Sequence, residues 1–157
     1  MGRMYTVSFS FVSISSAGST QDFFYLKPAA DKPCKVHRAH LESDGTTDQA
    51  IRVRILRLPA TVTVGSGGSA PTPTPMDVND AAAGATTRIN DTTVATTSGT
   101  AVVVDASIVH TLSGYDFHPT PEERPKVANA EAIVVRLEAA PGTTFNCSGT
   151  LTFEEGP

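Results

Sequence analysis

Large apolar residues alternate with small polar ones near the start of the chain, and this period of two constrains the fold most. From Tyr5 to Phe11 every second residue is Tyr, Val or Phe, and the residues between them are Thr or Ser. Side chains of a β-strand point alternately to its two faces. The pattern therefore predicts a strand whose aromatic and valine side chains, Phe11 included, face a core, while the hydroxyl residues face water or a partner.

Similar alternation or short apolar runs recur along the chain, separated by Gly, Pro and Asp turns. No segment carries an apolar stripe of helical period over three turns. Many short strands between such turns predict an all-β, single-domain sandwich over residues 1–157, of jelly-roll or immunoglobulin-like type, with about eight or nine strands. The absence of Trp argues against a true immunoglobulin domain. The expected strands are 5–11, 23–26, 34–41, 50–58, one or two within 86–96, 101–112, 130–139 and 147–155.

Two pairings are expected from these patterns. The first and last strands both look core-facing, and their pairing would help to close the sheet edges. The dipeptide Asp44-Gly45 is a strong turn signal and predicts a hairpin between strands 34–41 and 50–58. Within the latter strand, alternation places Ile51 on the core side and Arg52 on the outer side.

Charge and hydropathy exclude some classes of partner. The chain has 157 residues and a net charge of −4, and its Lys and Arg residues form no basic run. A nucleic-acid-binding protein usually carries a clustered basic surface, so nucleic acid is not expected as a ligand. No apolar run approaches the roughly 20 residues of a membrane-spanning helix, so no membrane partner is expected. The alternation near the N-terminus favours a strand over a signal peptide, although "SSAGS" offers small residues for cleavage.

Candidate catalytic and metal-binding residues lack the spacing that would define a site. His37 and His40 are three apart, and on a regular strand they would face opposite sides and could not share an ion. His110 and His118 flank a segment with Ser113, and Asp105 and Asp116 are the nearby acids, but no sequence motif supports a triad. Adjacent Glu residues at 122–123 and 154–155 are interpreted as solvated pairs, and the Gly-rich stretch 65–68 is not followed by the Lys-Ser/Thr of a phosphate loop. We expect no enzyme activity, no metal site and no cofactor.

The two cysteines leave their pairing open. Cys34 and Cys147 could form one disulfide, but two cysteines are few for a small secreted scaffold. Two partly buried free thiols are the preferred interpretation.

Two proline-bearing insertions are the remaining candidates for function. Residues 65–85 divide into a Gly/Ser stretch, 65–70, expected to be a flexible hinge, and a stiffer strip, 71–84, with alternate prolines and a turn capped by Asp77 or Asn79. The second insertion spans 115–130. Proline-rich segments lose little entropy on binding, so both are expected to act as arms that contact a neighbour. The predicted protein-interface residues are Pro71, Pro73, Pro75, Met76, Val78, Tyr115, Phe117, Pro119 and Pro121.

Several of these stretches together resemble a group of small proteins encoded among the structural genes of tailed bacteriophages and prophages. The likeness runs through "MYTVSFSFVSISSAGSTQDFFYLKPAADKPCKVHRAHL", "SGGSAPTPTPMDVNDAAAGATT", "NDTTVATTSGTAV", "PTPEERP" and "AIVVRLEAAP…SGTLTFEE" and covers nearly the whole chain. No catalytic motif defines these proteins. The resemblance implies a virion component made in the bacterial host cytoplasm.

Small β-sandwich proteins in that setting commonly serve as capsid decoration, or cement, proteins, and this association gives the first functional expectation. Such a protein would sit on the capsid surface, bind the major capsid protein and associate with itself, for example as a trimer. The alternative is a tail or fibre component that binds a host surface or another tail protein. A third hypothesis, an enzyme or a secreted binding module, would require a metal site at the strand histidines or a processed N-terminus.

Overall fold

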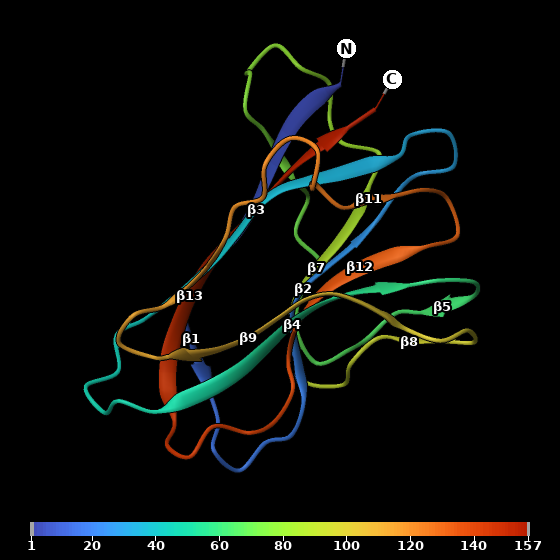
Figure 1. The fold of residues 1–157 in the computed structure, drawn as a ribbon. Coiled ribbons are helices and arrows are strands. Elements are labelled where there is room, and N and C mark those ends of the chain that lie inside the picture. Colours follow the sequence, from blue (N-terminus) through green and yellow to red (C-terminus); the bar gives the residue numbers. More distant parts are fainter. Residues whose placement is uncertain (1, 157) are drawn as a thin grey trace.

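The computed structural model describes residues 2–156, which form two antiparallel β-sheets packed face to face (Figure 1). These residues form thirteen strands joined by turns and loops, and none of them forms a helix that could cross a lipid bilayer. Nine strands are three residues or longer, which agrees with the expected eight or nine. The strands are β1 (Arg3–Ile14), β2 (Gln21–Lys27), β3 (Cys34–Ser43), β4 (Ala50–Leu58), β5 (Val62–Thr63), β6 (Thr74–Pro75), β7 (Thr86–Asp91), β8 (Thr96–Thr97), β9 (Val102–His110), β10 (Tyr115–Phe117), β11 (Lys126–Val127), β12 (Ala132–Leu137) and β13 (Phe145–Glu155).

The strand order is that of a jelly roll. One sheet has the order β10-β3-β13-β1-β6, and the other has the order β7-β2-β12-β4-β9. If the main strands β1, β2, β3, β4, β9, β10, β12 and β13 are numbered one to eight, the sheets read 6-3-8-1 and 2-7-4-5. The chain alternates between sheets at almost every step, as in two interleaved Greek keys. The predicted β-sandwich is confirmed, and of its two expected forms the jelly roll is the one observed.

The core lies between the two sheets and is rich in aromatic rings. The ring of Phe9 lies 5.2 Å from that of Phe24 and 6.3 Å from that of Phe23, while Tyr5 stacks on Phe153 at 5.8 Å. Strand β1 pairs with β13 along almost its whole length, which confirms the expected pairing of the first and last strands. Because β1, β13 and β2 all contribute rings, the two ends of the chain hold the centre of the sandwich together.

One residue of the opening strand does not follow the predicted alternation. The register between β1 and β13 shifts between Phe9 and Val12, so the strand bulges there. Phe11 lies in this bulge with φ of 54°, and 74% of its surface is exposed. The expectation that Phe11 faces the core is wrong because the extra residue of a bulge reverses the alternation beyond it.

The predicted hairpin at Asp44-Gly45 is also wrong. Strand β3 belongs to one sheet and β4 to the other, so residues 44–49 carry the chain from sheet to sheet. The dipeptide specifies a local turn, but tertiary packing decides whether the strands before and after the turn pair with each other. Within β4 the prediction is confirmed, since Ile51 is buried and Arg52 is exposed.

Residues 59–101, between β4 and β9, form a long distorted hairpin on the second sheet. Its outgoing and returning limbs pair through β5 and β8, and further along through bridges from Ser66 to Thr93 and from Ser69 to Ile89. The limbs cover one end of the outer face of the sheet, where Val62 and Ala95 pack on a second apolar cluster around Tyr25. The cluster's other members are Leu56, Leu58, Ala132 and Val134.

Candidate interaction surfaces

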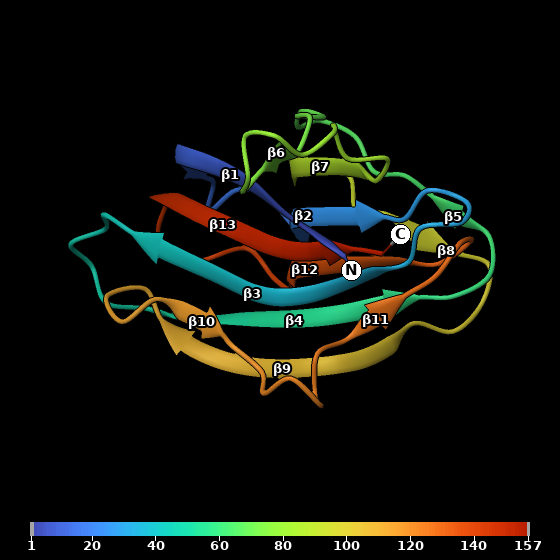
Figure 2. The same cartoon turned by 90° about the horizontal axis from the view of Figure 1, so that it is seen from above.

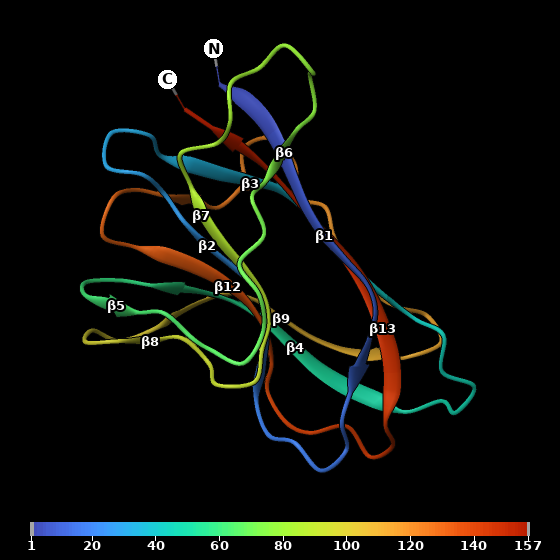
Figure 3. The same ribbon diagram turned by 180° about the vertical axis from the view of Figure 1, so that it is seen from behind.

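The segment 65–85, which we call the strap, lies along the body and does not extend away from it. Its Gly/Ser part is held by paired backbone bonds: Ser66 exchanges hydrogen bonds with Thr93, and Ser69 exchanges them with Ile89, all between 2.9 and 3.1 Å. Figure 3 shows the green strap running from the second sheet up to β1. The expectation of a flexible hinge at 65–70 is therefore wrong, because these backbone groups are used by the return limb.

Glycines make this close pairing possible. A Cβ on Gly68 would overlap the carbonyl oxygen of Ile89, and one on Gly65 would overlap that of Thr93. Gly67 has φ of 93°, a value that residues with side chains rarely adopt. These glycines thus allow the strap to pack closely against the returning limb of the hairpin.

The proline strip of the strap is also fastened to the body. Pro75 pairs with Tyr5 on the free edge of β1, and the amide of Met76 donates to the carbonyl of Met4 at 2.8 Å. The hydroxyl of Thr87 donates to the carbonyl of Pro71 at 2.6 Å. Of the predicted interface residues in the strap, Pro73 is buried and Pro71 and Pro75 are half-buried against this chain, which leaves Met76 and Val78 to face outward.

Within the strap, residues 76–80 form an exposed tip. Met76 is 63% exposed and Val78 is 91% exposed. The carboxylate of Asp77 accepts the amide of Asn79 at 2.9 Å, so the predicted capped turn is present, although it does not continue into a helix. Arg3 contacts Asp80 at 3.3 Å and holds the tip beside the start of β1. Two apolar side chains are thus presented on a turn with a specified shape.

A buried carboxylate anchors the far end of the strap. Glu155 is 3% exposed, and its Oε1 accepts the amides of Gly84 at 2.9 Å and Ala85 at 2.7 Å. Lys32 lies 3.6 Å from the second oxygen. The sequence interpretation of Glu155 as a solvated chain-end residue is wrong, because it lies on β13 and its buried carboxylate accepts backbone amides of the strap.

The second candidate surface is the opposite side of the sandwich, where β9 and β10 form the sheet edges (Figure 2). A cavity of about 480 Å³ opens between them and is lined by residues from both strands and from the loop that follows β10. The hydroxyl of Tyr115 donates to the Asp105 carboxylate at 2.8 Å, and burial together with this bond raises the pKa of Tyr115. Other lining residues are Ser107, Val109, Phe117, Pro119 and Glu123.

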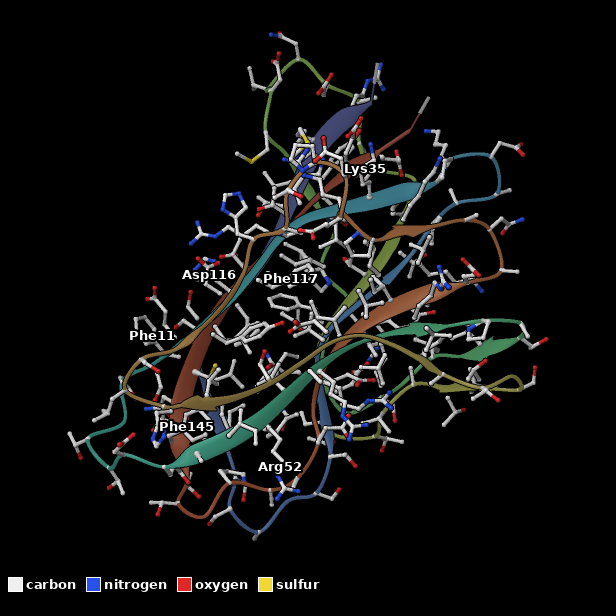
Figure 4. All side chains as sticks on the ribbon, in the orientation of Figure 1. Phe11, Lys35, Arg52, Asp116, Phe117 and Phe145 are labelled. Carbon is white, nitrogen blue, oxygen red and sulfur yellow. The ribbon has the colours of Figure 1, made fainter. Side chains whose placement is uncertain are left out.

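The loop after β10 splits one jelly-roll strand into two pieces. Both β10 and β11 pair with β3, at its two ends, and residues 118–125 leave the sheet between them. Figure 4 shows Asp116 and Phe117 on opposite sides of β10, with Phe117 directed between the sheets. Phe117 and Pro119 are half-buried beside the cavity, whereas Pro121 is exposed in the loop. The predicted interface residues therefore fall on two opposite edges of the molecule.

The residues considered for a triad are held by other partners. The Nδ1 of His110 contacts Asp48 at 2.9 Å, and Asp116 forms a two-point ion pair with Arg38, with contacts of 2.9 and 3.1 Å. Hydrogen bonding to Arg38 lowers the pKa of Asp116. The hydroxyl of Ser113 donates to a backbone carbonyl. Ser113 and His110 thus share one turn, but the Ser113 hydroxyl bonds to the backbone of His110 and the His110 ring bonds to Asp48, so these contacts do not form a triad.

The histidines of β3 also differ from the sequence expectation. Arg38 and Val36 of β3 lie opposite the consecutive residues Thr152 and Phe153 of β13. His37, between them, has no opposing residue and lies in a bulge. Core positions on β3 therefore change phase, and neither His37 nor His40 belongs to the core. His37 contacts Glu154 at 3.1 Å, and this bond lowers the pKa of Glu154. Within residues 2–156 no cluster of three or more His, Cys, Asp or Glu side chains has the geometry of a metal site.

Cys34 and Cys147 are free thiols, in agreement with the preferred interpretation. They are fully buried instead of partly buried, with 0% and 3% of their surface exposed. Burial raises the pKa of each thiol to about 12, so neither forms a reactive thiolate near neutral pH.

Exposed aliphatic side chains on β9 were missed as candidate surface residues. Val102, Val103 and Ile108 are 41%, 51% and 71% exposed. The sequence "AVVVDASIVH" resembles a core strand because it is rich in β-branched residues, and nothing local distinguishes an edge strand from a central one. Phe11 was missed for a related reason, since its bulge depends on the partner strand.

Comparison with known proteins gives no match at any level: no family model, no curated protein and no solved structure is similar to this chain.

Proposed function

We propose that this protein is a non-enzymatic structural component of a phage virion, and specifically a capsid decoration protein that binds the major capsid protein. The observation that carries the proposal is that apolar side chains are exposed on two opposite edges of one rigid jelly roll. A molecule with contact surfaces on two sides can bridge neighbours, which is what a capsid-stabilising protein must do. The jelly roll is common among capsid proteins, and this association adds weight to the proposal.

The strap would supply one contact in this function. Met76 and Val78 stand on a turn that is fixed by the pairing of Pro75 with β1 and by the ion pair of Asp80 with Arg3. A preformed turn loses little conformational entropy on binding, so even a small apolar contact can contribute to affinity. Many copies on one shell would then strengthen the lattice through repeated weak contacts.

The first experiment is to count copies of the protein in purified particles by quantitative mass spectrometry. Hundreds of copies per particle are expected for a decoration protein. A handful of copies would support the tail alternative, and complete absence from particles would overturn the virion assignment.

A second experiment tests the strap tip. Particles would be assembled with wild-type protein, with Met76→Lys and Val78→Lys together, or with Asp31→Lys as a charge control in the exposed turn between β2 and β3. The tip variant should occupy the capsid less and leave it less resistant to heating, with unchanged folding of the isolated protein. Equal occupancy by all three proteins would remove the tip from the contact. Point changes are preferable to deletion of 67–75, since that stretch also pairs with β7 and β1.

The cavity on the β9–β10 side favours the second candidate, a tail protein that binds a host surface. Its lining combines the aromatic rings of Tyr115 and Phe117 with the carboxylates of Asp105 and Glu123. Aromatic faces beside hydrogen-bonding oxygens are suited to sugars. Binding of purified protein to host cells, abolished by Phe117→Ala and competed by surface polysaccharide, would support this alternative.

A further inference from the structure

Strand β9 has one paired edge and one free edge. Among the described residues its partner is β4, and no strand lies on its other side (Figure 2). The carbonyl of Arg52 on β4 accepts the amide of Glu138, and therefore points toward β12. Backbone groups alternate in direction along a strand, so those of Ile51 and Val53 point toward β9.

The same alternation identifies the unpaired groups of β9. Val109 lies opposite Ile51 and Ser107 lies opposite Val53, so these two residues bond to β4. The amides and carbonyls of Ala106 and Ile108, which lie between and beside them, must point to the free edge. A run of edge groups is thereby available for another strand.

The usual protections of a sheet edge are weak along 105–110. Proline is absent there, and the single carboxylate, Asp105, is occupied by the hydroxyls of Tyr115 and Ser107 at 2.8 and 3.1 Å. The register with β4 shifts near Val104, and this bulge blunts only the start of the strand. Natural edges that lack charge, proline or cover tend to pair with another chain.

The sequence of this edge is complementary to itself in the antiparallel direction. With a two-fold axis at Ser107, Ala106 of one copy lies opposite Ile108 of the other, and their free backbone groups can form two hydrogen-bonded pairs. The apolar side chains of these residues then meet on the outer face. On the inner face Asp105 lies opposite Val109, so the two carboxylates are kept apart by about four residues of strand, or roughly 13 Å. No like charges oppose each other, which favours a second copy over a strand of unknown sequence.

We propose that two copies of this protein pair antiparallel through β9, centred on Ser107, and join their second sheets into one continuous sheet of ten strands. The pairing places the β9–β10 sides of both copies together, so Phe117 and the loop 118–125 of each molecule border the contact. This inference goes beyond the proposed virion function and does not depend on it.

Hydrogen exchange combined with sedimentation tests the pairing on the wild-type protein. Sedimentation should show a monomer–dimer equilibrium. The amides of Ala106 and Ile108 should become at least tenfold more protected as concentration rises through that transition, whereas those of Ser107 and Val109 should be protected throughout. Protection that is independent of concentration, or a monomer at every concentration, would overturn the proposal.

Substitutions locate the contact. Ile108→Lys should raise the dissociation constant of the dimer at least tenfold, because it places two lysines on the shared outer face. Val78→Lys is the matched control, since it adds the same charge to an exposed aliphatic position on the opposite edge, and it should leave the dimer intact. A dimer equally sensitive to both changes, or insensitive to Ile108→Lys, would contradict pairing through β9.

A cysteine at the axis tests the register. Ser107→Cys should form an intermolecular disulfide under mild oxidation, because residues facing each other in a non-hydrogen-bonded pair approach closely enough for one. Ser8→Cys, on an exposed position of β1, should not. The buried native thiols do not compete. Equal cross-linking at both positions would reject the register.

The dimer and the proposed function can fail separately. Dimers that do not bind capsids would support this inference and contradict the proposed function. A protein that stays monomeric and binds capsids would support the proposed function and contradict this inference.

Discussion

Arg136 and Asp22 form a two-point ion pair between neighbouring strands, with Nε 2.6 Å from Oδ1 and Nη2 3.1 Å from Oδ2. Asp22 is 1% exposed, and it also accepts the amide of Ala95 at 2.7 Å. The same guanidinium donates to the carbonyl of Ala95. This pair therefore fastens the returning limb of the 59–101 hairpin to β2 and β12 at once.

Removal of the guanidinium should leave an uncompensated buried charge. We expect Arg136→Met to lower the free energy of unfolding by about 3–5 kcal/mol, the range typical of a broken buried pair. Urea denaturation monitored by circular dichroism would measure it. Arg38→Met is the control: it breaks the exposed pair with Asp116 and should change stability little. Similar losses for both variants would mean that Arg136 does not act through burial of the pair.

Gly68→Ala should displace the strap from its return limb. The added Cβ would overlap the backbone of Ile89, which cannot move without breaking the pairing of β7 with β2. We expect a loss of about 2–3 kcal/mol, as for other strained backbone substitutions, and faster proteolysis within 70–84. Gly142→Ala provides the comparison, since its Cβ would lie 3.5 Å from the side chain of Gln49, an ordinary contact. Unchanged proteolysis of Gly68→Ala would show that the strap does not depend on this close approach.

Phe11→Gly should stabilise the isolated protein even though it removes a large side chain. A phenylalanine at φ of 54° is strained by its Cβ, while glycine adopts that conformation freely. After allowance for the extra entropy of glycine in the unfolded chain, we expect a gain of up to about 1 kcal/mol. Thermal unfolding of Phe11→Gly and Phe11→Ala would separate the two effects, because alanine keeps the strain and should give no gain. A lower melting temperature for the glycine variant would indicate that the exposed ring stabilises the fold.

Glu154→Gln should reduce the loss of stability in acid. Its hydrogen bond with His37 lowers the pKa of Glu154 in the folded state below the ordinary 4.5. Between the folded pKa and the ordinary value, the folded protein binds fewer protons than the unfolded chain. The contribution of Glu154 to the free energy of unfolding is therefore present above pH 4.5 and is lost as the pH falls through the folded pKa. Denaturation midpoints from pH 2 to 6 should therefore fall less steeply for the variant. Parallel pH profiles would contradict this role.

How much was predictable from sequence depends on how local each signal is. The inward faces of β4 and β13 follow directly from alternation, because a period of two is a property of the strand itself. Phe11 and His37 depart from it, since a bulge is set by the register with a partner strand. The connection at Asp44-Gly45 crosses between sheets for the same reason: the turn is local, but the pairing is not.

The candidate surfaces show the same division. The exposed turn with Met76 and Val78 is marked in the sequence by prolines and by the cap at Asp77. Glu155 was not identifiable as an anchor, because its donors at 84 and 85 are 70 or more residues away in the chain. Likewise, the valines of β9 lie on an edge only because the topology ends the sheet there.

The attachment of the strap to Glu155 has a consequence for synthesis. A ribosome makes Ala85 seventy residues before it makes the carboxylate that binds its amide. Throughout that interval the strap lacks its anchor on β13, and the core lacks the strand that joins β1 to β3. The C-terminal end of the strap can therefore reach its final attachment only late in translation.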